Sequence, residues 1–390
     1  MTQLNEIFTK VKDLAAFTTI PHQVVQSGLA QAMESMNAKE LEKKLAPVRK
    51  RLAKTLKSVQ KEFVARDDAV EAIIASLMSG VPAVLLGPPG TAKSAIIREL
   101  ARRCGLGPHQ HGEGEEAQGY FEYLLTSHTM PEELFGAPDL KVLTDESVFQ
   151  RNTQGMLPTA QFAFLDEVFR GGSHILNTLL SLLNEKIFHD GRSLIHVPLV
   201  GVVGASNEVP ADPDLAAFFD RFPIRVWLDS IFDSDRPQDS DAALIDSLLT
   251  ASAKHEMSNL KTSYSGGQVD SSQQISCMND FRCARAMITL QQHEELTNGR
   301  KGGAAAARTN EFLDLFKTLF KSCGLSDRSL FSLKRFAQTM SWLTEDPKSQ
   351  ARKTAHFKVF RYLARNSQER RRLEMDVHDA LQRSGHSGVE

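Results

Sequence analysis

The segment that most restricts the fold of this chain is Gly87-Pro-Pro-Gly-Thr-Ala-Lys-Ser94, which directly follows the apolar run Val81–Leu86. It matches G-x-x-x-x-G-K-[ST] at every fixed position and lies between a predicted strand and a predicted helix. Gly87 and Gly90 let the backbone curl so that its N–H groups face phosphate oxygens. Lys93 is placed to reach the β- and γ-phosphates, and the Ser94 hydroxyl is placed to bind Mg²⁺. The sequence therefore predicts a nucleoside triphosphate site formed by Gly87, Pro88, Pro89, Gly90, Thr91, Ala92, Lys93, Ser94 and Ala95.

The region from Asp67 to Leu228 alternates short β-like runs with helical or loop segments. Strands that alternate with helices favour a parallel sheet covered on both faces. We therefore predict an α/β fold for this region, with strands at Ala83–Leu86, Phe121–Thr126, Phe162–Leu165, Leu199–Ala205 and Ile224–Leu228.

Composition narrows the class of protein. A length of 390 residues suits two or three domains, and a formal net charge of −2 lacks the basic excess of a dedicated nucleic-acid binder. The four cysteines form no C-x-x-C pair, which indicates neither a disulfide framework nor a zinc site and fits a reducing cytosol. No apolar stretch is long enough to span a bilayer, and Met1–Phe17 lacks the apolar core of a secretory signal. We expect a cytoplasmic protein.

Other regions flank this α/β core, which we place at residues 61–228. Residues 1–60 are predicted to be a helical prefix, in which apolar residues recur every three or four positions on one long helix over Lys39–Lys61. This helix either packs on the body or contacts a partner, another subunit or a membrane surface through its basic face. Residues 229–343 are predicted to form a helical lid with a flexible loop near residues 263–274, and residues 344–390 a basic helical extension.

A hydrolytic site also needs a metal ligand and a base, and Phe162-Ala-Phe-Leu-Asp166-Glu167 supplies two carboxylates at the end of a predicted strand. We assign Asp166, with Ser94, to Mg²⁺, and Glu167 to the activation of water. A second buried strand ends in Asn207, whose amide can hydrogen-bond the γ-phosphate or the attacking water.

Two arginines complete the predicted catalytic set. Arg221 follows a short predicted helix and is our choice for an arginine finger that acts on a neighbouring subunit's nucleotide, with Arg225 as the alternative. Arg328 opens a helix of the lid after Ser326, and is predicted to report the γ-phosphate; Arg335 is the substitute.

These motifs together resemble the AAA+ ATPases and, within them, the MoxR family near its RavA-like branch. The likeness covers about residues 63–343 and rests on GPPGTAKS, FEYLLTSHTMPEELFG, FLDEVFRGGSHILNTLLSLLNEKIFHDGR, GASNEVPADPDLAAFFDRF and SDR. Ala92 stands where most AAA+ proteins have glycine. The resemblance implies a five-stranded core, ATP bound between core and lid, and active rings that are usually hexamers. It assigns Lys93, Ser94, Asp166, Glu167, Asn207, Arg221 and Arg328 to their motif roles.

The resemblance also implies partners. Family members commonly work with a protein that contains a von Willebrand factor A (vWA) domain, whereas the long C-terminal docking arm of RavA-like proteins does not fit in this chain. A β-hairpin insert is expected near residues 140–151, and Asp190-Gly191 predicts a second hairpin over Lys186–Ile195. Such hairpins project toward the pore or the client, or are plain surface hairpins.

Three functions fit these observations. The leading one is an oligomeric, Mg²⁺-dependent ATPase that remodels or matures a protein client in the manner of a chaperone. The second is a scaffold whose assembly is switched by nucleotide, with the basic prefix and tail as docking surfaces. The third is a DNA-directed motor, against which the near-neutral net charge argues.

Overall fold

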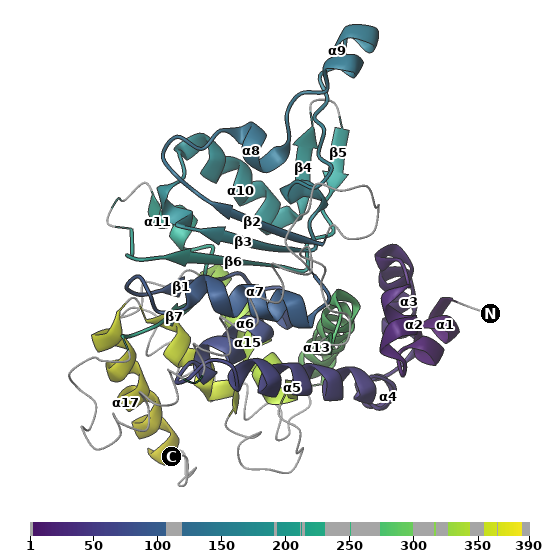
Figure 1. Ribbon diagram of the computed structural model, residues 1–390. Coiled ribbons are helices and arrows are strands. Elements are labelled where there is room, and N and C mark those ends of the chain that lie inside the picture. Colours follow the sequence, from purple (N-terminus) through teal and green to yellow (C-terminus); the bar gives the residue numbers. More distant parts are fainter. Residues whose placement is uncertain are drawn as a thin grey trace.

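The centre of the protein is a sheet with helices on both faces, as Figure 1 shows. A computed structural model describes residues 3–106, 119–190, 193–210, 215–230, 274–298, 327–343, 355–364 and 366–383, with residues 212, 250 and 316. The sheet has five strands in the order β2-β3-β6-β1-β7, and its neighbouring strands are parallel. The strands are β1 (Ala83–Leu86), β2 (Tyr120–Leu124), β3 (Phe162–Asp166), β6 (Gly201–Ser206) and β7 (Ile224–Trp227). The predicted α/β fold is confirmed, with β1 at its predicted bounds and the bounds of the other four strands shifted by one or two residues.

The sheet is buried on both faces because alternate side chains of its strands enter two different hydrophobic clusters. Ala83 and Leu85 of β1 belong to one cluster, whereas Val84 and Leu86 belong to the other. This alternation follows from the two-residue period of a strand. It explains why β1 is apolar at every position, as expected for a central parallel strand.

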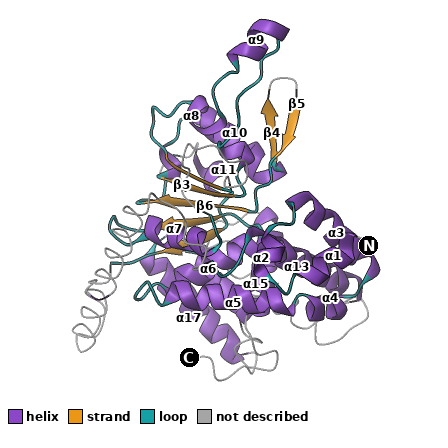
Figure 2. Ribbon diagram, turned by 45° about the vertical axis from the view of Figure 1, so that its right-hand side comes forward, coloured by secondary structure: helices purple, strands orange, loops and turns teal. Residues whose placement is uncertain are grey.

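Helices of the core connect and cover these strands (Figures 1 and 2). They are α6 (Asp67–Ser79), α7 (Lys93–Arg103), α8 (Pro131–Phe135), η1 (Leu157–Thr159), η2 (Val168–Arg170), α10 (Ser173–Glu185) and α11 (Ala216–Phe219). The buried residues of α6 and α7 lie in one cluster and those of α10 and α11 in the other. Because the strands are parallel, the carboxyl ends of β1, β3 and β6 all lie at one edge of this layered core.

The N-terminal prefix consists of α1 (Gln3–Lys10), α2 (Leu14–Thr18), α3 (His22–Ser35), α4 (Ala38–Lys44) and α5 (Ala46–Gln60). The predicted single helix over Lys39–Lys61 is wrong in one respect, since it is interrupted at Leu45. Pro47 explains the break, because it has no N–H to donate to the carbonyl of Lys43. The predicted apolar face is nevertheless buried, and five of its residues, Leu41, Leu45, Val48, Leu52 and Val59, have no exposed surface.

The C-terminal third contributes α13 (Met278–Asn298), α15 (Asp327–Leu343), η7 (Ala355–Leu363) and α17 (Ser367–Arg383). A buried ion pair between Arg51 of α5 and Asp280 of α13, 2.5 Å from Nη2 to Oδ1, joins the prefix to this region. Burial raises the pKa of Asp280, and its hydrogen bonds with Arg51 oppose that rise. Prefix and lid helices thus share one core, while the boundaries at residues 60, 228 and 343 stay predictions. Of the loop predicted at residues 263–274, all but Gln274 lies outside the described residues.

One predicted insert has a different structure. The β-hairpin expected at residues 140–151 is wrong, because the segment forms helix α9 (Leu140–Glu146) on a projecting loop (Figure 1). Asp139 explains the helix, since its carboxylate accepts hydrogen bonds from the N–H groups of Lys141 and Val142 as an N-cap. An isolated antiparallel bridge between Pro138 and Arg151 joins the two ends of the insert, and Arg151 Nη1 donates to the carbonyl of Gly136 at 2.8 Å.

The second hairpin is present beside this insert, with β4 (Ile187–Asp190) paired antiparallel to β5 (Ser193–His196). Asp190 is 2 % exposed and accepts a hydrogen bond from the backbone N–H of Arg151 at 2.9 Å. The base of the insert is therefore fastened to the last residue of β4, next to the turn of the hairpin.

Candidate nucleotide-binding site

The loop between β1 and α7 adopts the conformation that its glycines permit. Gly87 has φ 143°, and a Cβ there would lie 2.2 Å from the carbonyl oxygen of Leu228, so that only glycine fits. Gly90 has φ 80°. Ala92 has φ 67° although it carries a Cβ, and α7 begins at the next residue, Lys93. A left-handed conformation costs an alanine about 1–2 kcal/mol, so the surrounding loop must enforce it.

Lys93 is held inside this loop with only 8 % of its surface exposed. Its Nζ donates hydrogen bonds to the carbonyl oxygens of Gly87 at 2.7 Å and Pro88 at 3.0 Å, and to Asn207 Oδ1 at 2.9 Å. Desolvation lowers the pKa of Lys93, and the carboxylates of Asp166 and Glu167 act in the opposite direction. The ammonium thus donates its hydrogen bonds to uncharged oxygen atoms, and phosphate oxygens can replace these as acceptors.

The predicted metal ligands meet directly. Ser94 Oγ donates to Asp166 Oδ2 at 3.0 Å, and the other carboxylate oxygen of Asp166 accepts the backbone N–H of Glu167 at 3.0 Å. Hard oxygen donors of this kind suit Mg²⁺, which is commonly bound by one or two protein groups together with phosphate oxygens and water. Over the described part of the chain, no group of three or more His, Cys, Asp or Glu side chains is placed to hold a metal. The pair Ser94 and Asp166 therefore fits a magnesium ion that depends on the nucleotide for its remaining ligands.

Glu167 follows β3 in a left-handed conformation with φ 49°, which turns it away from the strand direction. One of its carboxylate oxygens accepts a hydrogen bond from Asn207 Nδ2 at 2.5 Å, and the other lies 3.3 Å from Arg170 Nε. Asn207 thus links Lys93 to Glu167 through the two ends of one amide. The structure brings the phosphate-binding group and the candidate base to the same side chain.

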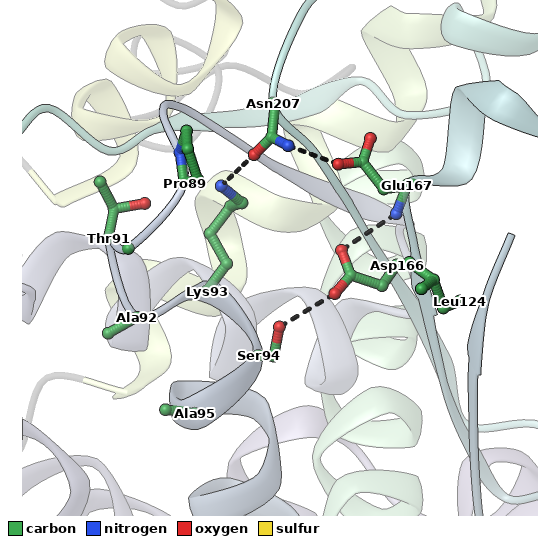
Figure 3. A pocket seen from close by; sticks show the side chains of 11 residues that line it. Pro89, Thr91, Ala92, Lys93, Ser94, Ala95, Leu124, Asp166, Glu167 and Asn207 are labelled. Carbon is green, nitrogen blue, oxygen red and sulfur yellow. Dashed lines mark hydrogen bonds between the residues drawn. The ribbon is translucent and has the colours of Figure 1, made fainter. Parts of the chain in front are cut away.

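These side chains surround a cavity of about 330 Å³ (Figure 3). Its lining consists of Pro89, Gly90, Thr91, Ala92, Lys93, Ser94, Ala95, Leu124, Asp166, Glu167 and Asn207. The predicted residues of the phosphate loop, the metal pair, the base and the sensor asparagine therefore meet at one place. The cavity combines backbone N–H groups and a cation at one side with two carboxylates at the other, which is the arrangement that phosphoryl transfer requires.

The predicted arginine finger lies elsewhere. Arg221 does not line the cavity and donates from Nη1 to Asn184 Oδ1 at 3.0 Å. The alternative, Arg225, is 1 % exposed, stacks on the ring of Phe219 and donates to the carbonyl of Phe222. Arg328 lies in the first turn of α15, and Arg335 lies two turns further along that helix. A buried Arg225 is poorly placed to reach another subunit, which favours Arg221.

Sequence reasoning missed two side chains of this site. Leu124 lines the cavity although 57 % of it is exposed, and the strand register that pairs it with Asp166 places it there. Arg170 contacts Glu167 from three positions further along the chain. Its spacing from Glu167 was visible in the sequence, but only the short helix η2 turns that spacing into a contact.

Comparison with known proteins agrees with this geometry. The sequence profile of the MoxR domain in the MoxR-vWA-beta-propeller ternary systems matches residues 50–262. The chain therefore belongs to the MoxR family of AAA+ ATPases. The profile does not single out one branch, so the RavA-like branch stays a prediction.

Two proteins of Methanocaldococcus jannaschii are similar in sequence. The uncharacterized protein MJ0079 is 40 % identical over 181 residues, or 46 % of this chain and 44 % of that protein. The uncharacterized protein MJ0812 is 41 % identical over 174 residues, or 45 % of this chain and 43 % of that protein. The matched part thus spans less than half the length of these curated relatives.

A solved structure of a candidate ATPase from Cytophaga hutchinsonii shares the fold, with a TM-score of 0.57 and 17 % identity. The likeness covers 88 % of this chain and 97 % of that one. Separately, a search of the described helices finds none with the length and apolar character needed to cross a membrane.

Proposed function

We propose that this chain is an ATPase that couples hydrolysis to the remodelling or maturation of a protein client within a homo-oligomeric ring. The observation that carries the proposal is the continuous set of contacts from Lys93 through Asn207 to Glu167, beside the pair Ser94 and Asp166. Structural glycine-rich loops have no need of a cation, two carboxylates and an amide that converge on one cavity.

Each group of residues around the cavity has its own role in ATP hydrolysis. Backbone N–H groups of the loop and Lys93 bind the phosphates, and Ser94 and Asp166 hold Mg²⁺. The ion, when bound, neutralises charge on the β- and γ-phosphates. Glu167 accepts a proton from the attacking water while the bond between the γ-phosphorus and the bridging oxygen breaks, which leaves ADP and phosphate.

Asn207 explains how the site rests without nucleotide. In the structure its amide accepts a hydrogen bond from Lys93 and donates one to Glu167. A γ-phosphate competes for Lys93, and the rearrangement frees a carboxylate oxygen of Glu167 for water. Arg170 stays available to orient the other oxygen.

The test is ATP turnover by the Glu167→Gln protein. We expect turnover to fall by about 10²–10⁴-fold with ATP binding retained, because the amide cannot take the proton. Glu185→Gln is the matched control, since Glu185 is exposed at the end of α10 and does not line the cavity. If the two variants hydrolysed ATP at the same rate, Glu167 would not be the base.

The ring is supported by Arg221, which lies outside the cavity of its own subunit. If Arg221 acts on a neighbour, mixing inactive Arg221→Ala with inactive Glu167→Gln restores activity. Mixed interfaces then combine an intact arginine from one subunit with an intact glutamate from the other. Mixtures that stay inactive at every ratio, while co-assembly is confirmed by pull-down, contradict action between subunits.

The client and the vWA partner are inferred from two features. The family profile describes MoxR domains of ternary systems that include vWA proteins. The projecting insert and the neighbouring hairpin expose Leu140, Leu143, Phe149 and Leu194 to solvent, at 71, 41, 44 and 60 %. Exposed apolar side chains on a projecting element suit contact with another protein.

Pull-down with Glu167→Gln in ATP tests for both partners. The same protein with Leu140→Asp and Leu143→Asp added should no longer capture the client.

A nucleotide-switched scaffold is the second candidate, favoured by the lysines exposed along α4 and α5. These are Lys39, Lys43, Lys44, Lys50, Lys54 and Lys57, followed by Lys61 directly after α5. Turnover that rises when a client is added supports remodelling, whereas slow turnover that ignores clients supports the scaffold.

A further inference from the structure

The C-terminal segment returns to the core and packs beside the nucleotide site. Helices η7 and α17 contact each other, and η7 also contacts β7 (Figure 1). Val359, Phe360 and Leu363 of η7 have no exposed surface and share a hydrophobic cluster with residues of β7. The segment is therefore part of the folded body in the described residues.

A network of charges fastens this segment to the start of α6. Arg370 donates from Nη2 to Asp68 Oδ2 at 2.7 Å and from Nε to Glu374 Oε1 at 3.2 Å. Arg361 donates to the other oxygen of Asp68 at 2.8 Å and lies 3.6 Å from Glu374. The four side chains alternate in sign and are each 24–36 % exposed. Closed networks of this kind hold geometry better than isolated surface ion pairs do.

Arg370 has a third contact, which leads to the phosphate loop. Its Nη1 donates to the carbonyl oxygen of Trp227, the last residue of β7, at 3.1 Å. The next residue, Leu228, donates its N–H to the carbonyl of Leu86 at 2.7 Å, and its own carbonyl occupies the place where a Cβ of Gly87 would lie. The carbonyl of Gly87 in turn accepts Lys93 Nζ. An unbroken series of contacts thus joins α17 to the phosphate-binding lysine.

The same arginine acts on the loop from a second side. Asp68 lies two residues after Arg66, which is 6 % exposed and occupies the N-cap position of α6. Arg66 is near enough to Lys93 for its charge to contribute to the lowered pKa of that lysine. The contacts of Arg370 thus lead toward the loop that holds Lys93, whereas Glu167 and Asn207 follow β3 and β6, which lie on the other side of β1.

We propose that Arg370 is a positioning residue of the nucleotide site. It clamps the end of β7 and the start of α6 together, and so holds the phosphate loop in the conformation that binds a nucleoside triphosphate. The inference rests on the proposed nucleotide site, and it assigns a role to the basic tail that differs from a free docking surface. Because the clamp acts on the loop and not on the base, it sets affinity more than the rate of the chemical step.

Full-length Arg370→Ala, Arg370→Lys and Arg372→Ala proteins test the clamp. Arg372 is the matched control, since it lies on the same helix, is 72 % exposed and, among the described residues, forms one long ion pair, with Asp376 at 4.0 Å. We expect Arg370→Ala to raise the ATP dissociation constant and KM by about 5–10-fold with kcat changed by less than about twofold. Arg370→Lys, which can keep the ion pair with Asp68 but not all three contacts, should lie between Arg370→Ala and the unmodified protein.

Binding is measured by titration calorimetry with ATP, and folding by thermal melts of the same samples. If folded Arg370→Ala binds ATP as tightly as Arg372→Ala does, the clamp is refuted, even though the unmodified protein binds and hydrolyses ATP. If Arg370→Ala does not fold, ATP binding by the Asp68→Asn protein tests the proposal instead. This substitution weakens the contacts of Asp68 with Arg361 and Arg370 and keeps the shape of the side chain. We expect Asp68→Asn to weaken ATP binding by about threefold or more, and unchanged affinity refutes the proposal. Absence of ATP binding in the unmodified protein would instead contradict the proposed function itself.

Discussion

Two lysines whose ammonium groups are shielded from water, at opposite edges of the core, show what distinguishes a functional site from a charge that destabilises the fold. Lys93 lies at the carboxyl ends of the strands, where three oxygen atoms accept its hydrogen bonds. Lys186 follows α10 near Arg285, which donates to the carbonyl of Val200 just before β6. Its Nζ is buried and has no hydrogen-bond partner among the described residues. Burial lowers the pKa of both lysines, and that of Lys186 falls to about 7.

The difference lies in what the surroundings offer. At Lys93 the neighbouring carboxylates Asp166 and Glu167 favour the charged form, whereas at Lys186 the positive charge of Arg285 disfavours it. A lowered pKa is thus no mark of function on its own. Lys93 is distinguished by the opposite charges and the open cavity that converge on it. Substitution by methionine should therefore weaken ATP binding at Lys93 and raise the stability of the protein at Lys186.

The largest effect is expected for Lys93→Met, which removes the ammonium that we propose contacts two phosphates. Hydrogen bonds to charged groups contribute about 1.5–3 kcal/mol each, so ATP affinity should fall by about 10²–10⁴-fold. Calorimetric titration with ATP measures the loss, and a thermal melt checks that the protein is folded. If ATP bound to Lys93→Met within about tenfold of the original affinity, the comparison between the two lysines would collapse.

Lys186→Met should leave ATP turnover unchanged and stabilise the protein. An ammonium with a pKa near 7 in the folded chain and 10.5 when exposed opposes folding at neutral pH. Methionine fills a similar volume without the charge, so we expect a gain of about 2 kcal/mol in the free energy of unfolding. Denaturant melts at pH 7 measure it. A loss of stability would mean that Lys186 has a partner in the folded protein.

The pH dependence of stability gives a smaller test. Between pH 7 and 8.5 the unfolded chain keeps a proton on Lys186 that the folded chain has largely released, so stability should rise with pH. We expect about 1 kcal/mol over this window, and a flat profile in Lys186→Met. Above about pH 8.5 the buried thiols oppose this trend, since burial raises the pKa of Cys104 to about 12 and the folded chain then holds its proton longer than the unfolded chain. An equal slope in both proteins would assign the rise to other groups.

The sequence predicted the features that depend on short, local patterns. The phosphate loop, the pair Asp166-Glu167 and Asn207 each follow a buried strand, and parallel strands bring such ends to one edge. That is why the cavity contains the residues predicted for it. The exact helical or extended state of the insert was not predictable from its apolar pattern, because the N-cap at Asp139 outweighed a short alternation.

Contacts between distant segments were beyond the sequence. Arg370 reaches Asp68 across 302 positions, and no local pattern of a basic tail distinguishes an internal clamp from a docking surface. The same limit applies to Lys186, whose lowered pKa depends in part on Arg285 of α13, 99 positions further along the chain. The predicted roles of Arg221 and Arg328 likewise depend on a neighbouring subunit or a moving lid, so a single chain does not test them.

The smallest expected effect concerns the backbone and not the charge of the phosphate loop. Ala92 and Lys186 both adopt φ above 50°, at 67° and 55°, and so does Ala65, at 55°. Glycine relieves the left-handed strain of about 1 kcal/mol but adds freedom to the unfolded chain, which leaves a net gain of about 0.5 kcal/mol. We expect this gain for Ala92→Gly and for the control Ala65→Gly, measured by thermal melts, with ATP affinity unchanged within about twofold. A marked loss of affinity in Ala92→Gly alone would show that the rigidity of alanine itself prepares the loop for phosphate. In that case the loop at Lys93 would differ from the turn at Lys186 in its backbone as well as in its charges.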